Sequence, residues 1–321
     1  MHHSEWEDIY HTNEPQSNTT NQKYNVNSGD FYANKVVFHS LGDSGVIYLD
    51  FANGNSLISS CTFLNSSNTG DQQGGSITIK NCQSALRKVC SIGSKSTAGN
   101  GGRFSRIEVA NDANSLNYYS EMSIFNNNQG YISGYNGIYI LNGRISFTKN
   151  NLTKNSCKYN SAIGIESTHG KVNYSFFDDN KSDSRLIMQI FQEIHYNSLI
   201  ISNNTVKIVD YRFPEMIDCS EGKSFFENCY FVNNNQGPNY LFGAFSATIA
   251  LSKCLIVSNN TKIHSGPGTF KTECPQQPEI VLDLYSTECC PGNVYQIYSN
   301  IITASKIYSS FMSNLNDALQ S

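Results

Sequence analysis

The chain has 321 residues, enough for one large domain or two ordinary ones, and only 15% of them are charged, against roughly 25% in an average soluble domain. Aromatic residues reach 12%, while 40 asparagines and 42 serines together make up about a quarter of the chain. The net charge of -4 and the aromatic content argue against a disordered chain and against a basic nucleic-acid-binding surface. No run of about 18 apolar residues is present, so the sequence encodes no membrane span.

The first 34 residues are mostly polar, and we expect them to form an N-terminal segment that caps one end of the fold. A secretory signal needs a basic start and an apolar run of about 7–15 residues, and residues 1–29 contain neither. A cytosolic protein, a shortened gene product and a fragment of a longer protein all stay open on this observation. His2, His3 and His11 lie near acidic residues, but a flexible polar terminus explains them more simply than a metal site does.

A short phrase recurs through the middle of the chain: a β-prone run, a Phe or aliphatic residue, and Asn three positions later. Its copies are Phe125 with Asn128, Phe147 with Asn150, Phe177 with Asn180, Ile201 with Asn204, Phe231 with Asn234, and Val257 with Asn260. The lead residues follow one another at intervals of 22, 30, 24, 30 and 26 residues. Looser copies extend the pattern in both directions, which predicts about ten to twelve repeat units.

Each unit contains further strand signals, such as the alternating runs at residues 76–79, 137–140 and 162–165. Units of this length without a helix are typical of parallel β-solenoid coils. Asn tolerates the left-handed backbone of a tight corner, and equivalent Asn side chains in successive coils would stack about 4.8 Å apart and bond in a ladder. A helical pattern is suggested only near residues 313–319. A leucine-rich repeat and a propeller fit less well, because their motifs and longer units are missing.

The ten cysteines show no zinc-binding spacing, so we predict neither a metal nor another cofactor. Cys61, Cys229 and Cys254 have similar local contexts and are expected to be buried core residues. Cys274, Cys289 and Cys290 lie in a Pro-rich stretch, where disulfides are plausible in an exported protein.

FxxN phrases begin at Phe125, Phe147, Phe177 and Phe231, and a GGxI-like run lies at residues 74–77. In these motifs the repeat resembles that of the polymorphic outer-membrane proteins. The resemblance implies a right-handed, single-stranded parallel β-helix of the pectin-lyase-like superfamily, with about ten coils. We assign residues 35–312 to this domain, with residues 270–295 as a Cys- and Pro-rich insertion or cap and residues 313–321 as a tail. The resemblance also implies a cell-surface or extracellular location, although the sequence carries no signal peptide, anchor or translocator barrel.

The same superfamily contains polysaccharide hydrolases and lyases, so the resemblance also allows a catalytic role. Glycoside hydrolysis needs two carboxylates, and the best candidates are Asp178 and Asp179, with His169 upstream and Arg185 downstream. Galacturonan hydrolases of this fold order their motifs differently, and carboxylates are ordinary at polar turns. The sequence therefore favours a turn role for these residues over catalysis.

The expected function is a non-catalytic scaffold, in which flat faces rich in Asn, Ser and Tyr bind glycans or partner proteins. A carbohydrate-active β-helix enzyme is the first alternative, and a truncated solenoid without independent activity is the second. Three or more carboxylates gathered with Arg or Lys in one groove would favour the enzyme.

Overall fold

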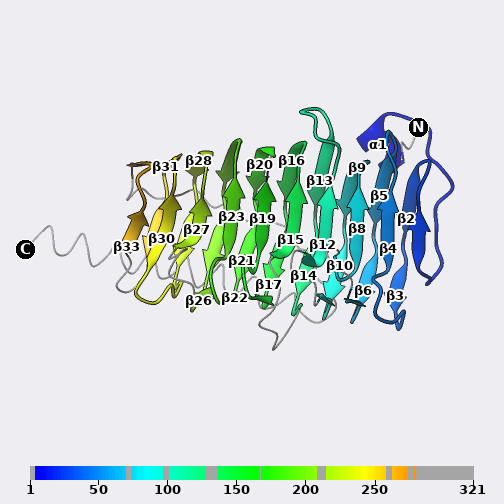
Figure 1. Cartoon of the computed structure of the whole chain (residues 1–321), viewed down its shortest axis with the longest axis horizontal. Helices are drawn as coiled ribbons and strands as arrows, with labels where there is room; N and C mark the ends of the chain where they lie inside the picture. Colours follow the sequence, from blue (N-terminus) through cyan, green and yellow to red (C-terminus); the bar gives the residue numbers. More distant parts are fainter. Residues whose placement is uncertain are drawn as a thin grey trace, which may run out of the picture.

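The computed structural model describes residues 4–69, 74–96, 101–127, 136–166, 168–207, 215–257, 262–273 and Pro278. The fold is an all-β parallel solenoid of about nine turns, one fewer than the ten expected. Its coils stack along one axis from the N-terminal to the C-terminal end (Figure 1). The described residues include one short helix, and none that is long and apolar enough to cross a membrane.

Each full turn contributes one strand to each of three long parallel sheets, called B, A and C in the order in which the chain visits them. Sheet B contains β1 (Tyr24–Val26), β4 (Ile47–Asp50), β8 (Ile77–Lys80), β12 (Gly102–Glu108), β15 (Asn136–Leu141), β19 (Ile163–Glu166), β23 (Ile187–Ile190), β27 (Glu215–Cys219), β30 (Tyr240–Ala244) and β33 (Lys262–Ser265). Sheet A contains β2 (Phe31–Asn34), β5 (Asn55–Ser59), β9 (Gln83–Arg87), β13 (Leu116–Ser120), β16 (Arg144–Thr148), β20 (His169–Asn173), β24 (Glu193–Asn197), β28 (Gly222–Glu227), β31 (Ala247–Ser252) and β34 (Thr269–Thr272).

Sheet C follows sheet A in every turn and is built from strands of three residues. Its members are β3 (Val37–His39), β6 (Thr62–Leu64), β10 (Cys90–Ile92), β14 (Ser123–Phe125), β17 (Asn151–Thr153), β21 (Phe176–Asp178), β25 (Ile200–Ser202), β29 (Tyr230–Val232) and β32 (Leu255–Val257). Two short sheets follow the corner after sheet C, formed by β7 (Ser67–Asn68) with β11 (Lys95–Ser96), and by β18 (Ser156–Cys157), β22 (Lys181–Ser182) and β26 (Thr205–Val206).

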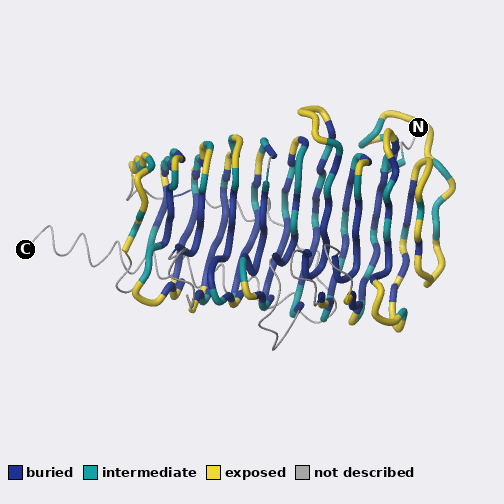
Figure 2. Tube along the Cα trace, in the orientation of Figure 1, coloured by how far each residue is buried: buried dark blue, intermediate teal, exposed yellow. Residues whose placement is uncertain are grey.

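The core runs the length of the solenoid, because successive strand residues point alternately inward and outward. Figure 2 shows buried strands and more exposed corners. Aromatic side chains stack along the axis in the core: Phe38 on Phe63 with ring centroids 4.8 Å apart, and Tyr196 on Phe226 at 4.4 Å. Such offset ring pairs stabilise beyond the area they bury.

The structure places the predicted lead residues in different positions. Phe177, Ile201 and Phe231 are equivalent and point into the core from sheet C. Phe125 and Val257 lie one residue beyond that position, which is filled by Ile124 and Ile256. A shift of one residue moves a side chain to the other face of a strand, so the sequence repeat is out of register at these two coils. Phe147 is a core residue, but it belongs to sheet A.

A column of hydrogen-bonded asparagines follows sheet C, formed by Asn127, Asn155, Asn180, Asn204 and Asn234. Each Oδ1 atom after the first accepts the backbone amide of the column residue one coil earlier, at 3.0–3.1 Å. Each Nδ2 group after the first donates to the carbonyl of the inward residue one coil earlier, as Asn204 does to Phe177 at 2.9 Å. These contacts tie consecutive coils together at a buried corner.

The left-handed backbone lies at the residue before each column asparagine, with φ between 48° and 56°. This position holds Asn126, Lys154, Asp179, Asn203 and Asn233. Asn150 occupies a different corner, between sheets A and C, where its Oδ1 atom accepts the amide of Met122 at 2.9 Å. Asn128 and Asn260 lie outside the described residues.

The N-terminal segment contributes to the sheets as well as covering them. Strands β1 and β2 fall within residues 1–34, so the solenoid begins before the expected boundary at residue 35. Asn18 pairs with Ala33 on the outer edge of β2, and the Asn21 side chain bonds both backbone groups of His39 on the edge of β3. These contacts occupy the edge groups that would otherwise be available for pairing with another chain.

The helix α1 (Glu5–Tyr10) begins with a capping box formed by Ser4 and Glu7. Its Trp6 side chain is fully buried against outward side chains of sheet A, Tyr32, Leu57 and Ala85. The helix therefore covers the side of the first coils. Most of the expected cap at residues 270–295 and the whole tail at residues 313–321 lie outside the described residues.

Candidate functional site

The outer face of sheet B carries a row of charged and aromatic side chains. The alternate residues of the same strands point inward and are mostly aliphatic. Equivalent outward positions in successive coils hold Tyr48, Thr78, Arg106, Tyr139 and Gly164. Two residues further along each strand, the outward positions hold Asp50, Lys80, Glu108, Leu141 and Glu166. We call the set Tyr48, Asp50, Lys80, Arg106, Glu108, Tyr139 and Glu166 the polar strip.

Side chains of the polar strip form a connected network around Tyr139. The Arg106 guanidinium lies 5.2 Å from the centre of the Tyr139 ring and donates to Glu108 at 3.1 Å. The Tyr139 hydroxyl donates to the Glu166 carboxylate. Burial, and next the contact with Glu166, raises the pKa of Tyr139, so the phenol stays protonated and keeps this hydrogen bond. Arg106 is buried, whereas Glu108, Tyr139 and Glu166 are partly exposed, so a ligand on this face can reach them.

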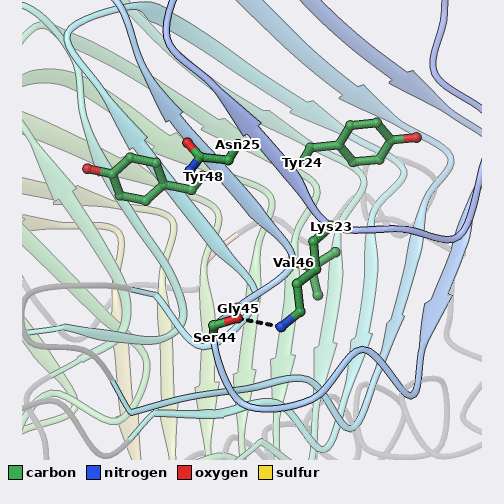
Figure 3. Close-up of a pocket in the computed structure, with 7 residues that line it drawn as sticks. All are labelled: Lys23, Tyr24, Asn25, Ser44, Gly45, Val46 and Tyr48. Atoms are coloured by element: carbon green, nitrogen blue, oxygen red, sulfur yellow. Dashed lines mark hydrogen bonds between the residues drawn. The ribbon is translucent and has the colours of Figure 1, made fainter.

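The N-terminal part of the strip has a similar arrangement around Tyr48. The Tyr48 hydroxyl donates to Asp50 at 3.3 Å, and the Lys80 ammonium lies 5.8 Å from the ring centre. A shallow hollow of about 360 Å³ adjoins it, lined by Lys23, Tyr24, Asn25, Ser44, Gly45, Val46 and Tyr48 (Figure 3). Tyr24 and Tyr48 point away from each other in this view, so the two rings do not form a clamp. The hollow extends the strip to the first coil.

A second polar cluster lies on sheet B but is closed to solvent. Arg185 forms an ion pair with Asp218, and Ser220 donates to the same carboxylate at 3.3 Å. Glu215 accepts a hydrogen bond from Ser265, and its Oε2 atom has no hydrogen-bond partner. Glu215 and Asp218 are both 0% exposed. We therefore interpret this cluster as part of the folded scaffold and not as a surface that a ligand reaches.

Burial shifts both carboxylates of this cluster. It raises the pKa of Glu215 to about 7, and the neighbouring Asp218 adds to this rise while Ser265 opposes it. Burial also raises the pKa of Asp218, and Arg185 opposes that rise. The protonated form of Glu215 is therefore favoured in the folded protein up to near-neutral pH.

Replacing Glu215 by Gln is expected to remove a pH-dependent loss of stability. Folding raises the pKa of Glu215 from 4.5 to about 7, so the folded chain binds this proton more tightly than the unfolded chain does. The native state therefore loses stability as the pH rises through this interval, by about 3 kcal/mol at most. The Gln carbonyl still accepts from Ser265. Urea unfolding at intervals between about pH 4 and 8 should show a smaller decline for the variant. An identical decline in both proteins would contradict the assignment.

The four catalytic candidates from the sequence do not come together. Asp178 is buried at the end of β21 in sheet C, where Ser202 and Asn203 donate to it at 2.7 and 2.8 Å. Asp179 is the left-handed corner residue and lies 3.7 Å from Lys181, with both side chains exposed. His169 starts β20 in sheet A, and Arg185 lies just before β23 in sheet B. These residues occupy different sides of the coil, as expected for turn and structural positions.

Sequence reasoning missed the polar strip and the buried partners of Arg185. Glu215 and Asp218 flank the apolar pair Met216 and Ile217, so the outward position of Asp218 could have been inferred from strand alternation. The strip forms because residues about 30 positions apart in the sequence lie side by side in successive coils. No local motif contains that information.

The described cysteines divide into two kinds. Six are buried thiols outside any disulfide: Cys61, Cys82, Cys157, Cys219, Cys229 and Cys254. Burial raises the pKa of Cys61 to about 11 and of Cys82 to about 12. A thiol with a raised pKa is a poor nucleophile, so these two are packing residues. Cys90 is disulfide-bonded. No group of three His, Cys, Asp or Glu side chains in the described part of the chain is arranged to hold a metal ion.

Comparison with known proteins adds no relative. No protein-family model matches the sequence, and neither a curated protein nor a solved structure matches it.

Proposed function

We propose that this protein is a non-catalytic solenoid scaffold that binds carbohydrate chains along the outer face of sheet B. The observation that carries the proposal is the polar strip, whose partly exposed carboxylates and tyrosines are pre-arranged by Arg106 and Lys80. Carboxylates accept hydrogen bonds from sugar hydroxyls, and tyrosine combines an apolar ring with a polar group at low entropic cost. The groups recur in steps of about 4.8 Å along the axis, which suits an extended ligand lying parallel to it.

The resemblance to polymorphic outer-membrane-protein repeats of the pectin-lyase-like superfamily supports a role in adhesion at a cell surface. The disulfide at Cys90 also favours an oxidising compartment, because disulfides are rare in the cytosol. Buried free thiols such as Cys61 are compatible with such a compartment, since they are shielded from exchange.

Replacing Tyr139 by Ala is expected to weaken glycan binding about tenfold, equivalent to about 1.4 kcal/mol. The change removes the ring beside Arg106 and the hydroxyl that positions Glu166. The measurement is a glycan array, followed by titration of the best ligand. Phe225→Ala is the matched control, because Phe225 is a partly exposed aromatic residue that stacks on His195 on sheet A, away from the polar strip. The glycan affinity of this variant should be unchanged. An equal loss of glycan affinity in both variants would contradict the proposal. So would a protein that binds no glycan on the array and binds only a partner protein.

A polysaccharide hydrolase is the second candidate, and the spacing of two glutamates favours it. Glu108 and Glu166 occupy equivalent positions two strand steps apart, which separates their backbones by about 9.6 Å. An inverting pair needs carboxyl groups roughly 6.5–9.5 Å apart, a separation that two glutamate side chains can reach from this backbone spacing. Both carboxylates already have partners, Arg106 and Tyr139, and this favours binding. A polyuronide degradation assay separates the two functions, since cleavage that disappears in Glu166→Gln while binding persists would establish the enzyme.

A further inference from the structure

A polar hollow of about 350 Å³ lies at the corner between sheets B and A, beside the N-terminal part of the polar strip. The polar side chains that line it are those of Asn53, Asn81, Gln83, Asp112, Asn114 and Ser115. None of the described residues around it is a cation or carries an aromatic ring. Its volume is at the lower end of the range of roughly 300–1,000 Å³ for small-molecule sites, so it has room for one small ring and not for an extended chain.

Two neighbouring coils supply corner residues to this hollow. Asn53 and Asn81 have left-handed backbone, with φ of 61° and 65°, and both are exposed. Asparagine tolerates this conformation. Gln83 begins β9 just after the second corner and is partly exposed. The Asn81 side chain donates to Asp50 at 2.8 Å, and since Asp50 belongs to the polar strip, this bond joins the hollow to the strip.

The third coil bounds the hollow with a loop that is longer than those of the adjacent coils. Residues 109–115 connect β12 to β13, whereas the corresponding corners before and after it contain two residues each, 81–82 and 142–143. The loop projects beyond the neighbouring corners (Figure 1). Its base is held by the next coil, because the Arg144 amide donates to the Ser115 carbonyl at 2.8 Å. Two residues suffice to connect the sheets, so the added length serves a purpose beyond connection, and added surface loops commonly carry binding residues.

Asp112 orders the tip of this loop. Its Oδ1 atom accepts the backbone amides of Asn114 and Ser115, both at 2.8 Å, and its Oδ2 atom accepts the Ser115 hydroxyl. These hydrogen bonds, that of the Ser115 hydroxyl first, lower the pKa of Asp112, so the carboxylate is ionised at neutral pH. The loop is therefore a preformed wall with a negative charge, beside which an anionic ligand group is disfavoured.

Three side-chain amides of the hollow are available to a ligand. Those of Asn53, Gln83 and Asn114 form no hydrogen bond to another residue in the part of the chain that the structure describes, so a ligand can bond to them without breaking a bond in the protein. Each amide has an acceptor oxygen and two N–H donors, and each sugar hydroxyl both donates and accepts. Several amides around a small hollow therefore match the adjacent hydroxyls of one sugar ring.

We propose that this amide-lined hollow binds a single neutral sugar unit that branches from a glycan lying on the polar strip. The inference rests on the proposed function and adds to it a preference for branched over linear chains. Asp50, Lys80 and Glu108 end their strands at this corner, so a chain parallel to the axis passes beside the hollow. The charge of Asp112, with no described cation to offset it in the hollow, disfavours an acidic branch such as a uronic acid.

Affinities for three matched oligosaccharides test the proposal: a linear chain, and the same chain with a neutral hexose branch or a uronic acid branch. We expect the neutral branch to raise the affinity of the unaltered protein at least about tenfold over the linear chain. Gln83→Ala combined with Asn114→Ala should abolish this gain and leave the linear affinity unchanged, which also shows that the variant is folded. Asn173→Ala is the matched control, because Asn173 is a partly exposed amide on sheet A, away from the hollow, and it should keep the gain.

Equal affinity of the unaltered protein for the linear and the neutral-branched chain would overturn the inference. A gain that survives in the double variant, or a tighter fit of the uronic acid branch, would overturn it as well. The proposed function is tested separately, since it requires Tyr139→Ala to weaken binding of the linear chain. If Tyr139→Ala has that effect while the branch has none, the strip binds glycans and the hollow takes no part.

Discussion

Replacing Asn204 by Ala is expected to lower the free energy of unfolding by about 3–5 kcal/mol, because it leaves several buried groups without partners. The Oδ1 atom of Asn204 accepts both the backbone amide and the side-chain amide of Asn180, each at 3.0 Å. Its Nδ2 group donates to the Phe177 carbonyl and to Asn234. A methyl group can replace none of these bonds, and the corner is too buried for water to do so.

Urea unfolding measures the loss for Asn204→Ala, and hydrogen exchange locates it. In a solenoid each coil contacts only its neighbours, so the amide of Asn180 should lose protection while amides of the first coils keep theirs. Asn25→Ala is the control, since Asn25 is exposed on β1. A loss below about 1 kcal/mol would mean that the asparagine column does little to hold the coils together.

Replacing Arg185 by Met should also cost about 3–5 kcal/mol, because Asp218 would be left as an uncompensated buried charge. Arg185 and Asp218 form an ion pair with side chains 7% and 0% exposed. Burial already raises the pKa of Asp218, and Arg185 opposes that rise, so the variant takes up a proton on folding. The deficit should therefore be smaller at about pH 5 than at pH 8.

A double-mutant cycle separates the ion pair from its surroundings. Arg185→Met combined with Asp218→Leu should recover much of the stability lost in the single variant, since replacing a buried pair by apolar residues is often neutral. Lys223→Met is the control, because the Lys223–Glu193 pair is 3.6 Å long and exposed, and such pairs contribute little. A double variant as unstable as Arg185→Met would mean that the cluster has a packing role that charge does not explain.

The fold could be predicted from the sequence because its main signal is local and repeated. Phe177 and Asn180, or Phe231 and Asn234, sit in one strand and one corner, so a pattern of three residues identifies both the inward side chain and the column asparagine. The same pattern failed at Phe125, because residues 126–128 are all asparagines and the register is ambiguous by one. It misled at Phe147, because the corner before sheet C carries the phrase Phe-Thr-Lys-Asn and the corner after it carries Leu-Thr-Lys-Asn at residues 152–155.

The candidate site was beyond the reach of such patterns. Arg106 and Tyr139 are 33 positions apart and become neighbours only because the chain passes through β13 and β14 and returns to sheet B one coil later. The predicted catalytic residues show the opposite error. Asp178 and Asp179 are adjacent in sequence, yet the chain turns between them, so one faces a buried corner and the other the solvent.

The asparagine column also determines how this molecule can change its length. The intervals between consecutive column asparagines are 28, 25, 24 and 30 residues. The same corner bonds therefore form with different lengths of chain between them. A stretch from one column member to the next is thus a complete module, and gene duplication or deletion at these points would add or remove a coil without disturbing its neighbours. Extensions of the loops would likewise create new surface variety while leaving the corner bonds in place, because loop-closure entropy grows only slowly with loop length.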